Sequence, residues 1–311
     1  MRSKVNERVC LNFYIIQMLT FASYLYFILK IIDKFLNKLF NKKNFINFFF
    51  DELYKKNITT LSINNKFIKF WTPGNYAKYF VDNFLKKEQI LENFILQIPD
   101  RKDVIFWDIG SNLGLYSIFC AANKKKIKIV SFECAPSAVL AISQNITLNN
   151  YENRIAICQI GLTNNKSSFL MLNLNKNSLG SQFNALGQNF LLKDKKIKII
   201  ESKFKIYSST IKKILQDKSM EVPNYIKIDV DGFELEILEG FGNFLKNKKI
   251  KSIVTEVKFG SRKIDNMTVD GKKIEARSNK IYSILSRAGF KSKHLEQGAK
   301  RKGWYLDIFY R

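Results

Sequence analysis

Residues 104–114 read Val-Ile-Phe-Trp-Asp-Ile-Gly-Ser-Asn-Leu-Gly, and this stretch decides the fold of the 311-residue chain. An apolar run ending in Asp108 is typical of a buried strand, and the Gly-x-Asn-x-Gly segment after it predicts a tight turn. The apolar pattern of residues 115–122 then predicts a helix. A strand, a glycine turn and a helix in this order form a nucleotide cradle, because backbone N–H groups and the positive end of the helix meet the ligand. The glycine spacing differs from the dinucleotide motif Gly-x-Gly-x-x-Gly and disfavours an NAD-dependent oxidoreductase.

Strand and helix patterns alternate from residue 104 onward, which is typical of a parallel sheet covered by helices. The residues between the third and fourth strands, 162–204, form a long excursion in which Phe169–Leu174 alternates like a strand. We expect an α/β fold with a mostly parallel, seven-stranded sheet, helices on both faces and an antiparallel last strand. The predicted strands are Val104–Ile109, Ile127–Phe132, Ile155–Ile160, Tyr225–Val230, Lys251–Val257 and Tyr305–Tyr310.

The second predicted strand ends in Glu133, 25 residues after Asp108. In nucleotide-binding α/β folds, an acidic residue at this place accepts hydrogen bonds from ribose hydroxyls. A carboxylate suits this task because it offers paired acceptor oxygens at a fixed spacing. We therefore expect Glu133 to bind a ribose.

The composition restricts the chemistry of the chain. Lys and Arg number 52 against 27 Asp and Glu, a net charge of +25, which is typical of a nucleic-acid or anionic-membrane partner. The abundance of Asn, Ile and Phe beside Lys also fits the codon bias of an AT-rich genome, and both interpretations stay open. The one histidine, His294, excludes a histidine-based triad or a multi-histidine metal site, and the four cysteines include no CxxC pair. We predict no metal site.

Three segments form a distinctive combination: Trp107–Ser117, Phe132-Glu133 and Lys227–Glu234, the last reading Lys-Ile-Asp-Val-Asp-Gly-Phe-Glu. This combination resembles the FkbM-type methyltransferases, which are S-adenosylmethionine-dependent enzymes of the Rossmann-like class I methyltransferase fold. The resemblance covers residues 100–310. Cys134 and Asp231 depart from it, because the family commonly has Pro and Glu at these positions.

The resemblance implies a role for each motif in binding S-adenosylmethionine. The loop Asp108–Gly114 would hold the methionine part, Glu133 the ribose, and Gln159–Leu162 would lie near the adenine. The expected cofactor-binding residues are Asp108, Gly110, Asn112, Gly114, Glu133 and Gly161. The end of the fourth strand would face the transferring methyl group and the acceptor, a hydroxylated metabolite, polyketide or sugar.

The carboxylates after the fourth strand are the candidates for catalysis. A hydroxyl is a poor nucleophile until its proton can leave, so a nearby base helps methyl transfer. The candidate catalytic residues are Asp229, Asp231 and Glu234. An alternative stays open for the last two, because Asp231 and Glu234 also match a capping box, with Asp231 as N-cap and Glu234 at the third helical position.

The N-terminal third is not explained by the resemblance. Val9–Leu29 contains no charged residue and is about long enough to span a bilayer as a helix, and Lys30 to Lys43 after it is basic. It is expected to be a membrane anchor, an interfacial helix on anionic lipid, or a helix packed on the core. We divide the chain into a hydrophobic segment (1–34), a helical extension (35–99) and a methyltransferase domain (100–311). The positive flank predicts a cytoplasmic protein tethered to the inner face of the membrane through residues 9–43.

The predicted function is S-adenosylmethionine-dependent O-methylation of a hydroxyl on a sugar, a glycan or a small metabolite. The loop Asn177–Asn184 and a predicted helix Tyr76–Ile98 are expected to shape acceptor choice. An RNA 2′-O-methyltransferase is the alternative enzyme, although no aromatic and arginine stacking platform is recognisable and nucleic acid is not the expected partner. A catalytically inactive, membrane-associated binding protein is the non-enzymatic alternative.

Overall fold

The computed structural model describes residues 2–40, 45–63, 65–87, 89–176, 178–180, 184–187, 200–230, 232–258, 262–264, 267–269, 271–295 and 304–311. The chain forms two compact units, Met1–Asn57 and Ile58–Arg311. Residues 58–99, which the sequence places in a separate extension, therefore pack in the same unit as the sheet.

The first unit consists of the helices α1 (Arg2–Phe40) and α2 (Phe45–Lys56). The two helices pack on each other: Ile46 is buried, and its backbone N–H donates to Asp33 Oδ1 at 2.9 Å. The Tyr26 and Phe50 rings lie 5.8 Å apart between their centroids. Within the described part of α1, Ile16–Leu39 is long and apolar enough to cross a membrane and is not buried inside the protein.

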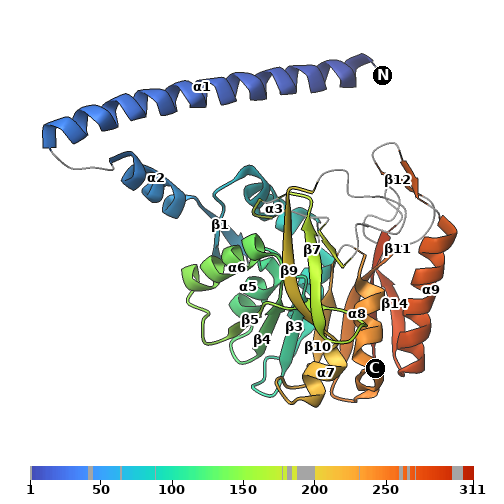
Figure 1. Cartoon of the computed structure of the whole chain (residues 1–311). Coiled ribbons are helices and arrows are strands. Elements are labelled where there is room, and N and C mark those ends of the chain that lie inside the picture. The colour runs from blue at the N-terminus through green and yellow to red at the C-terminus, as the bar shows by residue number, and fades with distance from the viewer. Residues whose placement is uncertain are drawn as a thin grey trace. The chain divides into compact units, whose positions relative to one another are not determined.

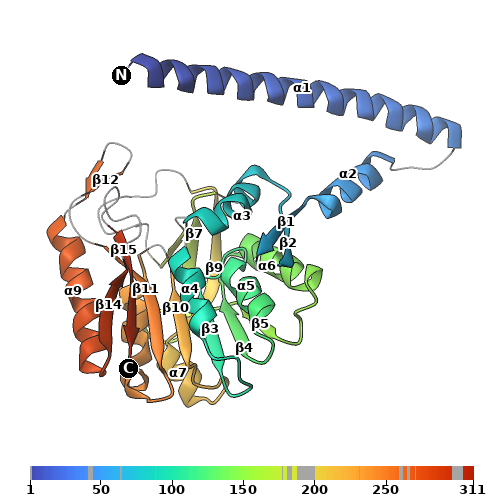
Figure 2. The same cartoon turned by 180° about the vertical axis from the view of Figure 1, so that it is seen from behind.

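The second unit is built on a seven-stranded sheet with the order β14-β15-β11-β10-β3-β4-β5 (Figures 1 and 2). The strands from β11 to β5 are parallel to one another, and β15 is antiparallel to both of its neighbours. The strands are β3 (Ile105–Ile109), β4 (Lys128–Phe132), β5 (Ile155–Cys158), β10 (Tyr225–Ile228), β11 (Ser252–Lys258), β14 (Lys291–Leu295) and β15 (Trp304–Tyr310). This sheet confirms the predicted fold class. β14 was not predicted, because its sequence Lys-Ser-Lys-His-Leu has no apolar alternation.

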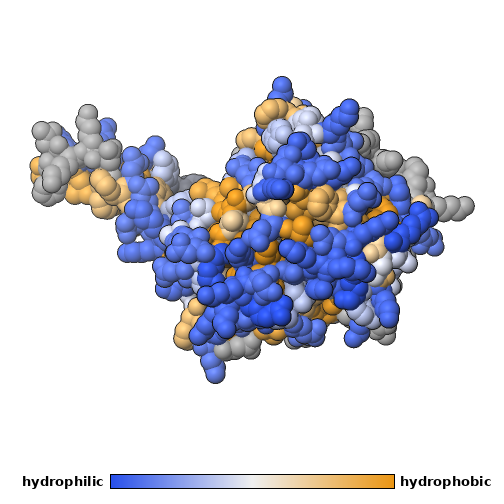
Figure 3. Space-filling view, turned by 90° about the horizontal axis from the view of Figure 1, so that it is seen from below, coloured by the Kyte–Doolittle hydropathy of each residue, from blue (hydrophilic) through white to orange (hydrophobic). Residues whose placement is uncertain are grey.

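Helices cover both faces of this sheet, and alternate residues of β3 pack into two separate cores. Phe106 packs in one cluster with Phe119 and Ile142, whereas Trp107 packs in the other with Leu238. The first face carries α3 (Asn75–Lys87), α4 (Gln89–Gln97), α5 (Leu115–Asn123) and α6 (Pro136–Leu148). The second carries α7 (Ile211–Gln216), α8 (Glu234–Phe241), the 3₁₀ helix η1 (Gly242–Lys246) and α9 (Gly271–Arg287). Hydrophilic residues cover most of the surface seen from below, with apolar patches between them (Figure 3).

A hairpin of β1 (Ile58–Ile63) and β2 (Lys66–Trp71) precedes α3 and contacts α6. The buried Asn145 side chain fixes this contact: its Oδ1 accepts from the Trp71 backbone N–H at 2.7 Å, and its Nδ2 donates to the Leu113 carbonyl at 2.8 Å. One amide thus joins the hairpin to the loop after β3. The predicted helix Tyr76–Ile98 is two helices, α3 and α4.

The long excursion builds a second sheet of four strands with the order β6-β9-β7-β8. Its strands are β6 (Gly161–Leu162), β7 (Ser168–Leu174), β8 (Ala185–Leu186) and β9 (Ser202–Ser209). The predicted strand at 169–174 is confirmed as β7. A small apolar cluster joins this sheet to the start of α6, with Leu172, Leu174, Leu186 and Ile206 against Ala135 and Ala138. A short antiparallel pair, β12 (Arg262–Ile264) and β13 (Met267–Val269), precedes α9.

Candidate functional site

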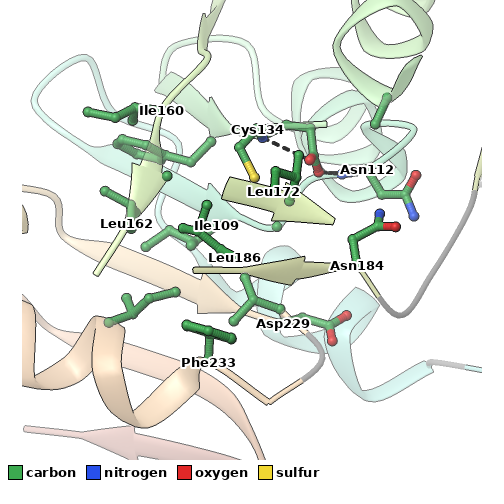
Figure 4. Close-up of a pocket in the computed structure, with 17 residues that line it drawn as sticks. Ile109, Asn112, Cys134, Ile160, Leu162, Leu172, Asn184, Leu186, Asp229 and Phe233 are labelled. Carbon is green, nitrogen blue, oxygen red and sulfur yellow. Dashed lines mark hydrogen bonds between the residues drawn. The ribbon is translucent and has the colours of Figure 1, made fainter. Parts of the chain in front are cut away.

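A pocket opens where the carboxyl ends of β3, β4 and β10 meet the four-stranded sheet (Figure 4). Open α/β sheets place their ligands at these strand ends. Its lining residues are Ile109, Gly110, Asn112, Phe132, Glu133, Cys134, Ala138, Ile160, Gly161, Leu162, Leu172, Asn184, Leu186, Asp229, Val230, Phe233 and Ile237. The pocket therefore contains four of the six expected cofactor-binding residues and one of the three candidate catalytic residues.

The glycine turn after β3 forms one wall of the pocket. Gly110 has φ +74°, and a Cβ on it would lie 2.0 Å from the Asp229 carbonyl oxygen, so only glycine fits between the ends of β3 and β10. The backbone N–H groups of Gly110 and Ser111 both donate to the Phe132 carbonyl, which ties the turn to β4. Gly114 has φ +76° and lies against Ile142, outside the lining residues, so it serves the packing of the turn.

Glu133 lies directly after β4 and is held by three backbone donors. Its Oε2 accepts from the Asn112 N–H at 2.8 Å, and its Oε1 accepts from the Cys134 and Ala135 N–H groups, each at 2.8 Å. Burial raises the pKa of Glu133 above its ordinary value of 4.5, and these three N–H donors and Lys227 oppose the rise. A carboxylate has about four acceptor positions, so the side chain is fixed in place and still has capacity for a ligand hydroxyl.

Asp108 lies outside the lining residues and is fully buried. Its Oδ1 accepts from the buried Lys227 ammonium at 3.0 Å, and its Oδ2 accepts from Ser117 Oγ at 2.6 Å. Lys227 also donates to the Gly110 carbonyl at 3.2 Å and lies 3.8 Å from Asp229 Oδ2. A buried ion pair is satisfied only when further hydrogen bonds complete it. The Asp108–Lys227 pair thus stabilises the glycine turn through the hydrogen bond from Lys227 to the Gly110 carbonyl.

The three candidate catalytic residues have different surroundings. Asp229 lines the pocket, and its side chain is 41% exposed. Glu234 is buried, and its Oε1 accepts from the Val230 and Gly232 N–H groups, so it fixes the loop after β10. Asp231 lies outside the described residues. The helix α8 begins at Glu234 itself, and Phe233 precedes it without a side-chain cap, so Glu234 is the first helical residue rather than the third.

A helix on the outer edge of the unit also holds this loop. Arg277 of α9 donates to the Gly232 carbonyl at 3.0 Å and pairs with Glu236 at 2.6 Å. Glu236 belongs to α8, so the guanidinium joins α9 to both the loop and the helix after it. Glu234 and Arg277 thus both hold Gly232, in the loop that follows Asp229.

The remaining wall is apolar and comes largely from the excursion. Gly161 lines the pocket at the start of β6, where a Cβ would lie 2.7 Å from Leu186 Cδ2. Leu172 and Leu186 have no predicted role, because only the pairing of β7 with β8 places them over the pocket. Phe233 belongs to the segment after β10 that is expected to face the methyl group and the acceptor, and it lines the pocket. The sequence predicts Asn184 only as the end of the loop Asn177–Asn184, whose residues 177 and 181–183 lie outside the described residues. Among the described residues, no group of three or more His, Cys, Asp or Glu side chains is arranged to hold a metal ion.

Comparison with known proteins identifies the family of this domain. The family model of the methyltransferase FkbM domain matches residues 108–292. Methyltransferase sdnD of Sordaria araneosa is 26% identical over 165 residues, which cover 47% of this chain and 62% of sdnD. The hexuronic acid methyltransferase AglP of Haloferax volcanii is 25% identical over 181 residues, which cover 57% of this chain and 64% of AglP. The chain thus spans less than two thirds of the length of these relatives.

Among solved structures, the methyltransferase FkbM from Methylobacillus flagellatus is similar with 14% identity and a TM-score of 0.43, over 69% of this chain and 45% of that one. The family model spans the glycine turn, Glu133 and Asp229, which line the pocket described above. The chain therefore belongs to the FkbM family of S-adenosylmethionine-dependent methyltransferases.

Proposed function

We propose that this protein transfers the methyl group of S-adenosylmethionine to a hydroxyl oxygen of a sugar, glycan or other small hydroxylated acceptor. One observation carries the proposal: a single pocket contains the Gly110 turn, the Glu133 carboxylate and Asp229. The sequence predicts a different part in the same reaction for each of these residues, and they follow three different strands.

The pocket offers a suitable wall to each part of the cofactor. Ile160 and Leu162 offer apolar contact to the adenine ring, and Glu133 offers an acceptor oxygen to the ribose hydroxyls. The missing Cβ of Gly110 leaves the turn close to the end of β10, where the methionine part would lie. When bound, S-adenosylmethionine supplies a methyl group that its sulfonium charge has already activated.

The protein's own task is then to align the acceptor, exclude water and take up a proton. Asp229 is the carboxylate of the pocket wall placed to accept the proton that a hydroxyl loses. Lys227 keeps the carboxylate oriented, with its ammonium 3.8 Å from Asp229 Oδ2. Glu234 and Arg277 hold the backbone on which Asp229 is carried.

The acceptor class is supported by the chemistry of the site and by one relative. A carboxylate base suits a hydroxyl, and AglP is named a hexuronic acid methyltransferase, so its acceptor is a sugar acid. The net charge of +25 suits an anionic acceptor such as a uronic acid. The exposed apolar stretch Ile16–Leu39 supports a location at the cytoplasmic face of a membrane, with Lys30, Lys34 and Lys38 near anionic headgroups.

The test uses the full chain with methyl-labelled S-adenosylmethionine and a panel of hexoses, uronic acids, glycans and RNA oligonucleotides. We expect labelled carbohydrate, and an Asp229→Asn variant that binds the cofactor but transfers methyl about 10²–10⁴-fold more slowly. Gly110→Ala is expected to lose cofactor binding, whereas Gly74→Ala, with nothing within 4 Å of its added Cβ, is the matched control. Full activity of a folded Asp229→Asn variant would refute the base, and labelled RNA would establish the 2′-O-methyltransferase instead.

A further inference from the structure

The four-stranded sheet brings a polar side chain over the polar end of the pocket. Asn184 directly precedes β8, whose pairing with β7 matches Ala185 to Asn173 and Leu186 to Leu172. Ala185 is fully buried, and Leu186 belongs to the apolar cluster on α6. The backbone of Asn184 is therefore placed by a paired and buried strand, so its side chain can serve as a fixed contact.

The Asn184 amide oxygen is buried and has no hydrogen-bond partner among the described residues. A buried acceptor without a partner costs free energy, and native proteins keep such groups mainly where a ligand or water completes them. Asn184 lines the pocket, and Figure 4 shows its side chain between those of Asn112 and Asp229. The unsatisfied oxygen therefore points to a ligand donor in the pocket.

The chemistry of this end of the pocket indicates which kind of ligand group donates the hydrogen bond to Asn184. Asp229 contributes a carboxylate and Asn184 an amide oxygen to the lining of this end of the pocket. At the other end, Ile160 and Leu162 are apolar (Figure 4). The nearby negative charge of Asp229 makes a cationic donor to the Asn184 oxygen more favourable than a neutral hydroxyl.

We propose that Asn184 accepts a hydrogen bond from the α-ammonium group of the cofactor's methionine part. The four-stranded sheet would then bind S-adenosylmethionine as well as cover the pocket. This inference rests on the proposed function, since it requires S-adenosylmethionine in the pocket. It gives Asn184 a role in binding the cofactor, whereas the sequence connects the loop that ends at this residue only with acceptor choice.

Calorimetry on the full chain tests the inference without knowledge of the acceptor. Two probes are compared: S-adenosylhomocysteine, which carries the amino-acid part, and 5′-methylthioadenosine, which lacks it. Asn184→Ala is expected to weaken S-adenosylhomocysteine binding about 10-fold to 100-fold and to leave methylthioadenosine binding unchanged. Asn184→Asp keeps an acceptor oxygen at the same place and is expected to retain the binding of S-adenosylhomocysteine.

Two controls make the outcome decisive. Asn93→Ala removes an asparagine that lines a separate hollow beside α4, and it should change neither affinity. Thermal unfolding of each variant shows that the fold is intact. Unchanged S-adenosylhomocysteine binding in Asn184→Ala, an equal loss for both probes, or an Asn184→Asp variant as weak as Asn184→Ala would each overturn the inference. If the unmodified protein binds neither probe, the proposed function itself fails, and this result is distinguishable from the other three.

Discussion

At the residue scale, the feature that organises the site is the buried pair of Asp108 and Lys227. Their atoms lie 3.0 Å apart with side chains 0% and 3% exposed, on neighbouring strands in register. The Lys227 ammonium also lies 5.0 Å from the centre of the Tyr116 ring and donates to the Gly110 carbonyl. This one cation therefore stabilises a buried carboxylate and the backbone of the cofactor turn together.

Lys227→Met is expected to destabilise the protein by about 3–5 kcal/mol, because it leaves the Asp108 carboxylate buried without its partner. Lys128→Met is the matched control: it removes an exposed pair with Glu221 and should cost about 0–1 kcal/mol. Denaturant unfolding measures both. Equal costs for the two variants would contradict the role assigned to Lys227.

Glu133 predicts how cofactor binding depends on pH. Its raised pKa means that the folded protein binds this proton more tightly than the unfolded chain does. The contribution of Glu133 to folding is fully present below pH 4.5 and is lost as the pH rises through the raised pKa. Ribose binding requires the opposite state, because only the carboxylate has acceptor oxygens to spare.

The affinity for S-adenosylhomocysteine is therefore expected to fall as the pH decreases through a window above 4.5, the ordinary value for a glutamate. Glu133→Gln is expected to bind about 10-fold more weakly at neutral pH and to lose this dependence. Calorimetry at a series of pH values measures both proteins. A Gln variant with the same pH profile as the unmodified protein would show that another group titrates.

At the element scale, the four-stranded sheet is the part that differs most from a plain parallel α/β domain. Its apolar cluster is much smaller than the two clusters that sandwich the main sheet. Local stability follows the amount of buried apolar contact. The sheet of β6 to β9 is thus the part of the pocket wall best suited to open for ligand exchange.

Leu174→Ala tests whether the four-stranded sheet opens separately from the rest of the unit. Leu174 is fully buried in the small cluster, and its truncation should cost about 2–5 kcal/mol of local stability. We expect faster amide hydrogen exchange in β7 and β9 and unchanged exchange in β3. Leu238→Ala, equally buried but in the large cluster of α8, is the control and should speed exchange throughout the unit. Uniform acceleration in both variants would mean that the cover does not open separately.

The sequence predicts the seven-stranded sheet well and the four-stranded sheet poorly, because the first follows from local patterns and the second depends on strand register. The apolar runs that end in Asp108 and Glu133 are local patterns, and they locate the strand ends that carry the pocket. Lys227 cannot be placed from a local pattern. It alternates with Ile226 and Ile228 as an exposed residue of a strand would, yet it pairs in register with Asp108, 119 residues earlier in the chain. Asn184 likewise enters the site only through the register of β7 and β8, which no local pattern contains.

At the scale of the whole molecule, the chain joins an α/β unit to a helical unit with an exposed apolar stretch. Ile16–Leu39 is not buried, and large apolar side chains such as Phe21, Tyr24 and Phe35 are each more than 60% exposed. Exposed apolar surface of this extent is typical of protein or membrane interaction sites. Under the proposed function, we infer that binding to a membrane would bring the protein close to an acceptor at the membrane surface.

Binding of the full chain to phospholipid vesicles is expected to increase with anionic lipid. Replacing Lys30, Lys34 and Lys38 by Gln should weaken it by about 1 kcal/mol per charge, measured by vesicle sedimentation. Replacement of Lys248, Lys249 and Lys251, which lie in the second unit, is the matched control. Equal weakening in the two triple variants would show that the net charge of +25, rather than the helix, drives the association.

The central claim is that the pocket between β3, β4 and β10 binds S-adenosylmethionine, and a crystal structure with S-adenosylhomocysteine tests it most directly. We predict ribose hydroxyls within hydrogen-bond distance of Glu133, the adenine beside Gly161 and Leu162, and the amino-acid part beside Gly110 and Asp229. A ligand bound elsewhere, with Gly110 and Glu133 not touching it, would contradict the account.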